Sequence, residues 1–434
     1  MDRRTSMSPR GRNGSGTSIT AGASSPIMAT PERNSERPSL VVSDKAESDS
    51  DAISLHSSAS VSLLPLLWVH TTVGDLVNIE KLVSIDHKIS VEIAFEKLSQ
   101  NRLTCLPLTR HGRIFDFFDY ADLTGYLLLV LGDITVKGEH SHTFEERIRK
   151  ARQGIPASVG FAAQFGGGHD PFVHMPSHTS LTAAFERFAS GVHRIAVTSS
   201  ATGDVIGILS QRRMVRYVWN NLRRFPNLEQ ALESTLEEQK IGTYDDVISI
   251  AGDAPVIDAL VKMHALAVSS IAVVDSNNNL LGNISVTDVS LLTRAWQAGL
   301  LRQSCKHFLT VILDHRGIEY GGNESVPVFY VYKNTKLSKV IATLVATRAH
   351  RLWICEHSTD PAQSGKLIGV ISLTDVLNFV ARHSGNQNLD PEAARRHRRS
   401  SSSSVRSNNT IRHILHDGSP LERPKLIFER SRNT

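Results

Sequence analysis

The chain has 434 residues, a formal net charge of +5 and three cysteines, at positions 105, 305 and 355. An odd, scattered set of cysteines argues against a disulfide framework and favours a reducing compartment. The longest apolar stretches, residues 63–69 and 126–131, are far shorter than the ~20 residues of a membrane-spanning helix. No apolar secretory segment follows the N-terminus, so we expect an intracellular protein with no membrane partner.

Residues 1–60 are rich in serine, proline, glycine and charged residues and contain few aromatic ones. Such a segment buries too little apolar surface to offset the entropy cost of ordering, so we predict a disordered tail. Ser8, Ser25 and Thr30 each precede a proline, and we expect phosphorylation in this tail.

The first ordered unit is predicted at residues 65–130. Ser90 can cap a helix whose apolar residues recur at helical spacing, and a short apolar strand begins at Cys105. A second strand runs into Asp116–Asp122 (DFFDYAD), where another helix starts. Residues 131–168 are expected to be a linker, and the glycine run at 166–168 is interpreted as a flexible loop.

The same order of elements returns at residues 169–225. Ser180 precedes the helix, and His193-Arg194 opens the next strand. The second strand ends in Gly207–Arg213 (GILSQRR), which has Arg213 where the first unit has Asp122.

Residues 240–300 and 305–383 are predicted to hold two further units. Their second strands end in nearly the same phrase, Gly282–Val289 (GNISVTDV) and Gly369–Val376 (GVISLTDV). His350-Arg351 opens the first long strand of the fourth unit, and the third unit has Ser269-Ser270 at that place.

Residues 384–434 are predicted to be a second disordered tail, rich in basic residues and serine. Its basic run at 395–399 is followed by five serines at 400–404. The run is interpreted either as a solvated tail or as a nuclear-targeting or anion-binding segment, so both cytoplasmic and nuclear localisation are expected.

Four phased copies of helix, strand, turn, strand and helix indicate units that bury their apolar faces against one another. The unit resembles the CBS (cystathionine-beta-synthase) domain, and two in tandem resemble a Bateman module. This resemblance implies an α/β chain of α+β repeats, with four CBS domains in two Bateman modules between disordered tails. Four copies are similar to the gamma subunit of AMP-activated protein kinase. The layout, over about residues 65–383, also resembles a fungal family of tandem-CBS proteins, the Sds-type regulators of protein phosphatases and mitotic progression.

The Ser-x-Thr-Asp end of the repeated phrase is a candidate nucleotide site. A carboxylate can accept hydrogen bonds from both hydroxyls of a ribose, and backbone N–H groups at a helix start attract phosphate. The alternative is that these residues are ordinary helix caps. The candidates are Ser285, Thr287 and Asp288 in the third unit, and Ser372, Thr374 and Asp375 in the fourth.

The likeness to kinase gamma subunits implies which units cooperate, because the His-Arg pairs of those proteins reach phosphates held by the neighbouring unit. On this basis Asp288 is expected to share an adenylate with His350 and Arg351. Ser269 is expected to donate to the phosphate at the Asp375 site.

Asp122, with His193 and Arg194, forms a less complete set. Two more carboxylates lie close in sequence, and the phosphate-facing serine is missing, so an anion is disfavoured there. The Arg213 unit lacks the ribose acceptor and is expected to bind no nucleotide.

No P-loop, His-Glu-x-x-His or Gly-x-Ser-x-Gly motif occurs, so we expect no catalytic activity, no required cofactor and no metal site. The resemblance implies a regulator that binds AMP, ADP or ATP. It would inhibit a type-2A-like protein phosphatase and link nutrient or stress state to cell-cycle progression, DNA replication and cell separation. The alternatives are a gamma-like subunit of an energy-sensing kinase and a nucleic-acid-associated protein that uses the basic tail. Nucleic acid is the less expected partner, and a homodimer is left open.

Overall fold

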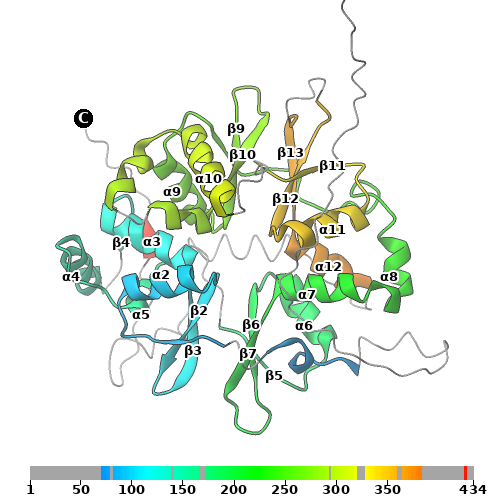
Figure 1. The fold of residues 1–434 in the computed structure, drawn as a ribbon, viewed down its shortest axis with the longest axis horizontal. Helices are drawn as coiled ribbons and strands as arrows, with labels where there is room; N and C mark the ends of the chain where they lie inside the picture. The colour runs from blue at the N-terminus through cyan, green and yellow to red at the C-terminus, as the bar shows by residue number, and fades with distance from the viewer. Residues whose placement is uncertain are drawn as a thin grey trace, which may run out of the picture. The chain divides into compact units, whose positions relative to one another are not determined.

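The computed structural model describes residues 70–78, 82–137, 141–166, 172–292, 295–319, 328–358, 364–383 and 425–427. Within these ranges one unit recurs four times, a three-stranded sheet with a helix before and after its hairpin (Figure 1). The two long strands of each unit pair antiparallel, and a short leading strand pairs in parallel with the first of them. The predicted α/β repeat architecture is therefore confirmed.

The bounds of the repeated elements follow the sequence periodicity closely. The first repeat comprises β1 (Ile85–Asp86), α2 (Val91–Gln100), β2 (Cys105–Arg110), β3 (Arg113–Asp119) and α3 (Tyr120–Leu131). The second comprises β5 (His174–Pro176), α6 (Leu181–Ala189), β6 (Arg194–Thr198), β7 (Val205–Ser210) and α7 (Gln211–Asn220). The third comprises β8 (Ser249–Ala251), α9 (Val256–Ala265), β9 (Ser270–Val274), β10 (Leu280–Ser285) and the 3-10 helix η5 (Val286–Leu292). The fourth comprises β11 (Tyr330–Tyr332), α11 (Leu337–Thr347), β12 (Arg351–Cys355), β13 (Leu367–Ser372) and α12 (Leu373–His383).

The remaining elements lie between or beside the repeats. They are η2 (Gly74–Leu76), β4 (Thr135–Lys137), α4 (Ser141–Arg152), α5 (Val159–Ala162), η4 (Leu222–Arg224), α8 (Pro226–Ala231), η6 (Ala295–Arg302), α10 (Cys305–Glu319) and β14 (Lys425–Ile427).

Each repeat also receives a segment from outside its own stretch of sequence, which forms backbone hydrogen bonds with the turn between its short first strand and its first helix. In the first two repeats these segments are residues 157–160, which bond to residues 87–91, and residues 71–74, which bond to residues 177–181. In the last two repeats, residues 303–306 bond to residues 252–256, and residues 235–237 bond to residues 333–335. Because the segment before the first repeat docks on the second, these two repeats are interleaved into one module. The third and fourth repeats form the other module by the same exchange.

The apolar core joins the two modules through helices. One cluster of buried side chains draws on the first and third repeats, including Leu128 of α3 and Leu260 of α9. A second cluster draws on the second and fourth repeats, including Phe188 of α6 and Phe379 of α12. The helix before each hairpin (α2, α6, α9 and α11) shows the spacing that buries one face, whereas α12 is buried on nearly all sides, as expected for repeats that cannot bury their apolar surface alone.

Two parts of the predicted domain layout differ from the structure. Residues 131–168 are not a plain linker, because Phe144 of α4 and Phe161 of α5 are buried in the core of the first repeat. The boundary placed at residues 300–305 falls after α10 instead, since Phe308 and Leu309 of that helix pack with the third repeat. Short amphipathic segments carry too little periodicity to be assigned to a neighbour from sequence.

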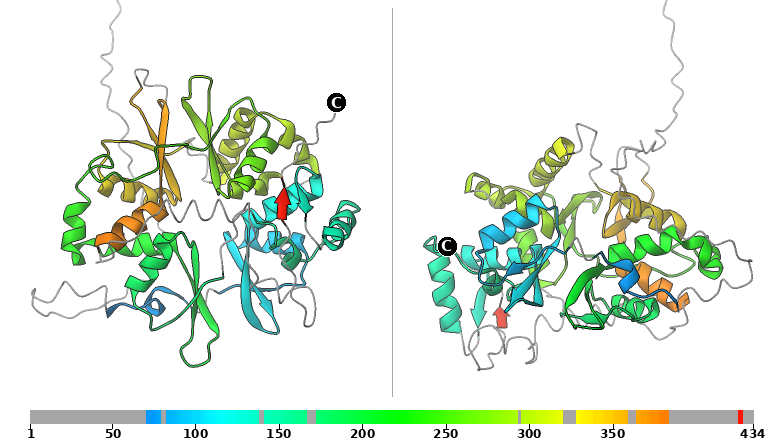
Figure 2. Two further views of the ribbon diagram at one scale, coloured as in Figure 1. Left: turned by 180° about the vertical axis from the view of Figure 1, so that it is seen from behind. Right: turned by 60° about the horizontal axis from the view of Figure 1, so that its bottom comes forward.

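Part of the C-terminal tail forms a strand. β14 pairs antiparallel with β4, and the right view of Figure 2 shows its red arrow beside the teal arrow of β4. The predicted disorder of the rest of both tails concerns residues outside the described ranges.

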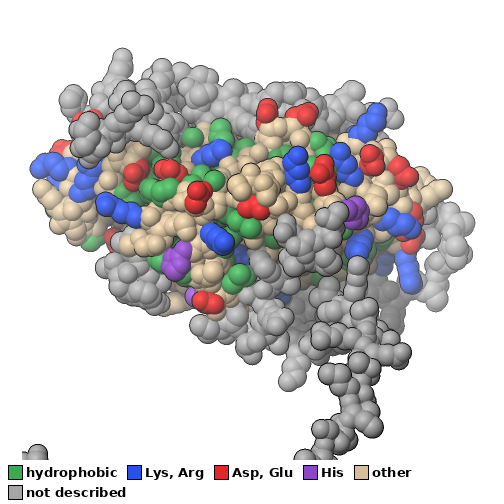
Figure 3. Space-filling view, turned by 90° about the horizontal axis from the view of Figure 1, so that it is seen from above, with side chains coloured by type: hydrophobic (Ala, Val, Ile, Leu, Met, Phe, Trp, Pro, Cys, Tyr) green, Lys and Arg blue, Asp and Glu red, His purple; other side chains and the backbone are tan. Residues whose placement is uncertain are grey.

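The surface in Figure 3 carries basic and acidic side chains interspersed over the coloured part of that face. None of the helices among the described residues combines the length and the hydropathy of a transmembrane span.

Candidate functional site

In the second, third and fourth repeats the serine of the repeated phrase is the last residue of a strand, and the hairpin register places it opposite the residue that opens the neighbouring strand. Ser285 lies opposite Ser270 in the third repeat, and Ser372 lies opposite Arg351 in the fourth. The second repeat pairs Ser210 with Arg194 in the same way. The recurring register of the hairpin thus brings the phrase and the His-Arg position of each repeat to one end of the sheet.

The aspartate of the phrase folds back onto its own strand end. One oxygen of Asp288 accepts the backbone N–H of Ser285 at 2.7 Å, and one of Asp375 accepts that of Ser372 at 2.8 Å. Asp122 accepts the N–H of Asp119 at 2.8 Å. The capping role considered for these residues is therefore present, and it uses one carboxylate oxygen of each.

Asp288 is almost fully buried, and its other oxygen lies 3.4 Å from Nη2 of Arg316 on α10. Burial raises the pKa of this carboxyl, and the Arg316 guanidinium and the Ser285 N–H oppose the rise. The Ser285 hydroxyl lies 2.5 Å from that of Thr287, whose side chain is exposed. Two hydroxyls and a carboxylate therefore gather at this strand end.

The fourth repeat uses its hydroxyls differently. Ser372 donates its hydroxyl to Asp375 at 2.7 Å. Thr374 is buried and accepts a hydrogen bond from Nε2 of Gln211, in the second repeat, at 3.0 Å. Its predicted role toward phosphate would require this bond to break.

The arginine of the fourth repeat reaches the third. Arg351 Nη2 donates to the hydroxyl of Ser269, and Nη1 donates to the carbonyl of Ser270 at 3.2 Å. Both acceptors are neutral. Arg351 thus contacts the third repeat, while the adenylate that Asp288 is expected to share with His350 and Arg351 stays a prediction.

The arginine of the second repeat reaches the first in the same way, with a different acceptor. Arg194 Nη2 donates to the carbonyl of Thr104 at 3.4 Å, and Nη1 lies 2.9 Å from the carboxylate of Asp119. Asp119 occupies the position of Ser285 and Ser372 in the repeated phrase. The first repeat therefore supplies its own anion to the arginine of the second.

The two His-Arg pairs belong to one basic cluster that spans both modules. His350 as a whole residue is exposed, yet desolvation of its ring and then Arg212, His193, Arg351 and Arg194 lower its pKa. His350 is therefore neutral near pH 7, and an anion placed among these groups would offset their mutual repulsion.

Sequence reasoning missed two basic residues of this region. Arg212 occupies the position of Thr287 in the phrase of the second repeat; its pKa is lowered by desolvation and then by Arg348 and two neighbouring arginines. Aligning the phrases position by position would have singled it out. Arg316 carries no such signal, because α10 lies outside the repeated pattern.

Other parts of the chain cover the two remaining phrase positions, Asp122 in the first repeat and Arg213 in the second. A Cβ added to Gly166 would lie 2.2 Å from Oδ1 of Asp122, so the backbone there covers the carboxylate. Arg213 turns its guanidinium to the carbonyl of Leu76 at 2.9 Å, on the segment before the first repeat. Neither position presents a ribose acceptor.

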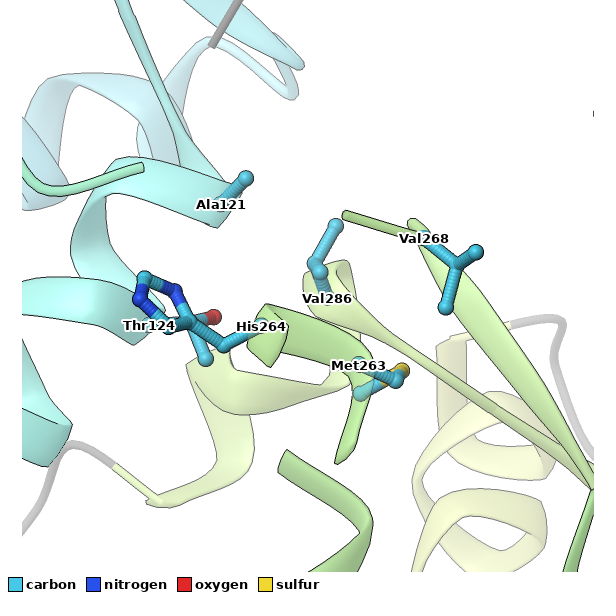
Figure 4. A pocket seen from close by; sticks show the side chains of 6 residues that line it. All are labelled: Ala121, Thr124, Met263, His264, Val268 and Val286. Atoms are coloured by element: carbon cyan, nitrogen blue, oxygen red, sulfur yellow. The ribbon is translucent and has the colours of Figure 1, made fainter. Parts of the chain in front are cut away.

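A small pocket lies between α3 of the first repeat and α9 and the start of η5 in the third, and its residues Ala121 and Val286 are sequence neighbours of Asp122 and Thr287 (Figure 4). Burial lowers the pKa of its histidine, His264, to about 4, which keeps the ring neutral at pH 7. The lining is otherwise mostly apolar, which suits no phosphate. It consists of Ala121, Thr124, Met263, His264, Val268 and Val286.

Comparison with known proteins identifies the class of protein to which this chain belongs. The model of the CBS domain matches residues 169–220, 241–292 and 324–382, which are the second, third and fourth repeats. The first repeat has the same elements in the same order. The chain is thus a CBS-domain protein built from four such units.

Relatives at higher identity define the family. The chain is 45% identical to Protein SDS23 of Yarrowia lipolytica over 370 residues, which cover 79% of this chain and 73% of that protein. It is 43% identical to Protein SDS23 of Kluyveromyces lactis over 418 residues, covering 90% of this chain and 77% of the relative. The chain belongs to the SDS23 family of fungal proteins.

A solved structure shares the fold of four repeats. It is Protein MJ1225 from Methanocaldococcus jannaschii, described as a suggested archaeal homologue of the gamma subunit of AMP-activated protein kinase. The TM-score is 0.55 at 15% identity, over 71% of this chain and all of that one.

Proposed function

We propose that the chain is a non-catalytic regulator that binds an adenine nucleotide in its C-terminal module, at the strand ends of the third and fourth repeats. The observation that carries this proposal is the contrast between two equivalent arginines. Arg194 meets the Asp119 carboxylate, whereas Arg351 meets the hydroxyl of Ser269 and a carbonyl, and serine stands at both positions equivalent to Asp119.

The chemistry of the third repeat suits a ribose phosphate. The carboxylate of Asp288 would accept from the ribose hydroxyls once it exchanges the bond to Arg316 for them. Thr287, exposed at the start of η5, would donate to phosphate. Arg351 would supply the forked donors that phosphate prefers, and His350 a donor whose charge responds to the ligand.

The strand end of the fourth repeat is proposed as a second, weaker adenylate position. Asp375 and Ser372 would face the ribose, and Ser269 would donate to phosphate. Its weakness follows from Thr374, whose hydroxyl is already bonded to Gln211. Asp122, with His193 and Arg194, is not proposed as a site, because Gly166 and Asp119 occupy it.

Calorimetric titration of the full chain with AMP, ADP and ATP tests the proposal. Arg351→Gln should weaken the bound nucleotide about tenfold or more, because a hydrogen bond to a charged group contributes roughly 1.5–3 kcal/mol. Lys336→Gln is the matched control: it also removes one positive charge from the fourth repeat, at an exposed surface ion pair. Absence of binding heat, or equal weakening by both substitutions, would reject the site.

We further propose that this site controls a type-2A-like protein phosphatase by inhibition, and so links nutrient or stress state to the cell cycle, in both cytoplasm and nucleus. Support comes from membership of the SDS23 family and its resemblance to phosphatase regulators. Capture of phosphatase subunits from cell extract by the tagged full chain is the expected result.

A gamma-like role in an energy-sensing kinase is the second candidate, and the shared fold of four repeats favours it. Capture of kinase alpha and beta subunits would identify that role. A nucleic-acid partner has less support, since basic and acidic residues alternate over the face seen in Figure 3. Such a partner would bind with a steep loss of affinity in salt.

A further inference from the structure

The short strand β4 is paired with a strand from the far end of the chain. Lys425 lies opposite Lys137, Leu426 opposite Val136 and Ile427 opposite Thr135, in antiparallel register. Among the described residues β14 is the one strand that pairs with β4, and together they form a two-stranded sheet separate from the four repeat sheets.

The elements around β4 leave one of its edges available for pairing with another strand. β4 lies directly after α3, and α4 packs against it. Arg152 at the end of α4 donates to the carbonyls of Leu129 and Val130, which fixes α4 to the end of α3. Two large apolar side chains near these contacts in the sequence are exposed: Leu131 is 47% exposed and Ile155 is 50% exposed. An isolated edge strand beside apolar surface invites pairing with another strand.

We propose that β4 is a strand-docking edge which the chain's own C-terminal segment, Lys425–Ile427, occupies in cis. The docked segment closes the edge to an extended strand of a protein partner, the mode of recognition in which main-chain hydrogen bonds add a strand to a sheet. This inference is independent of nucleotide binding and of the proposed phosphatase link.

The sequence of the segment suits an added strand. Leu426, Ile427 and Phe428 form an apolar run in a tail that is otherwise mostly polar, and Ile and Phe favour strands. Pro424 precedes the run, and proline is tolerated at the entry to an edge strand.

The connection along the chain favours docking within one molecule. At most ~3.3–3.6 Å per residue, the 41 residues 384–424 could extend over roughly 135–150 Å, so their length does not prevent β14 from reaching β4. A tethered segment meets its site at a high effective concentration, so three paired residues suffice where a separate peptide would bind weakly.

Hydrogen exchange of the full chain, read by mass spectrometry, tests the proposal. The double variant Leu426→Pro/Ile427→Pro removes whichever of the two N–H groups faces β4. At least one amide within residues 135–137 should then exchange roughly five- to tenfold faster, as expected for loss of one or two hydrogen bonds. Arg412→Pro, elsewhere in the same tail, should leave the exchange at β4 unchanged. Amides of β9 and β10 serve as the folding control.

Two further measurements decide which strand pairs with β4. Excess peptide of residues 420–434 should restore protection of β4 in the double variant. Equal exchange of β4 in the unaltered chain and the double variant would overturn the proposal. Protection that rises with protein concentration, together with a dimer in light scattering, would also overturn it, since the strand would then come from a second copy.

Discussion

The carboxylate of Asp119 lies 2.9 Å from the guanidinium of Arg194, at the position where the third and fourth repeats carry serine. The equivalent Arg351 donates to the hydroxyl of Ser269 and the carbonyl of Ser270. At equivalent places in the two modules, Arg194 thus meets a carboxylate, and Arg351 donates to a hydroxyl and a carbonyl.

Replacing that carboxylate should make the N-terminal module resemble the C-terminal one. Asp119→Ser keeps a good helix cap, because serine can accept the N–H groups that Asp119 now accepts at the start of α3. The ion pair is lost between two side chains that are 16% and 25% exposed, so unfolding free energy should fall by roughly 1–3 kcal/mol. The full chain should also gain an additional anion-binding event, measured by titration with pyrophosphate.

Asp86→Ser is the control for this change. It removes a carboxylate from the same repeat, but one that is half exposed and lies 3.5 Å from His87. An unaltered titration for Asp119→Ser, with stability equal to that of Asp86→Ser, would show that Asp119 does not stand in for a ligand.

The buried carboxyl of Asp288 should affect stability and binding in opposite directions. Burial raises the pKa of the Asp288 carboxyl in the folded chain. The stability gained from its protonation is therefore complete below the unfolded pKa of ~3.9, and it is lost as the pH rises through the folded pKa. Asp288→Asn removes the ionisable group and keeps an oxygen for the Ser285 N–H. Denaturant unfolding at pH 7 should therefore show equal or higher stability.

Adenylate affinity of the same variant should fall about tenfold, since a charged acceptor for the ribose is lost. Asp275→Asn, at an exposed turn, should leave affinity unchanged. A variant of Asp288 that loses more than ~2 kcal/mol of stability and keeps its affinity would assign the residue a capping role alone.

The basic cluster predicts proton uptake on nucleotide binding. Partial desolvation and cationic neighbours lower the pKa of His350, so the folded chain loses stability as pH falls below the unfolded value of ~6.5. A bound phosphate would raise that pKa again, and affinity should increase between pH 7.5 and 6.

Calorimetry at pH 6 in two buffers of different ionisation enthalpy measures the protons taken up. His350→Asn should reduce that number and flatten the dependence of stability on acid pH. The same proton count in both proteins would place the phosphate away from His350, and His193→Asn would then identify the histidine responsible.

Much of the fold could be predicted from sequence because its signals are local. The helical spacing of Leu337, Val340, Ile341 and Leu344 matches α11, and the strand expected at 351–355 is β12. The leading strands β1, β5, β8 and β11 were missed, because segments of two or three residues carry no readable alternation. The phrase of the third repeat opens a 3-10 helix, η5, where an ordinary helix was expected.

The candidate site was predictable in its residues and less so in its partners. Local spacing indicated Ser285, Thr287 and Asp288, and the family resemblance implied that Arg351 reaches the third repeat. The pairing of Arg194 with Asp119 depends on how two repeats face each other, which no local pattern encodes. The same is true of Thr374 with Gln211, and of Asp288 with Arg316 on a helix outside the repeat.

Closure of the first repeat by its own chain leads to a final prediction at Gly166. This residue lies against Asp122, and an added Cβ would lie 2.2 Å from Oδ1 and 3.4 Å from the Cα of that residue. Both neighbours are held firmly: Phe165 is fully buried, and Asp122 is part of the capping box of α3. Gly166→Ala should therefore cost roughly 1–3 kcal/mol of unfolding free energy, as for other overpacked sites. Gly299→Ala is the matched control, because nothing lies within 4 Å of its added Cβ, and it should change stability by less than ~0.5 kcal/mol.

Urea unfolding of both variants measures the difference. Equal stability would mean that the backbone at Gly166 does not cover Asp122, and Asp122, His193 and Arg194 would then return as a candidate nucleotide site.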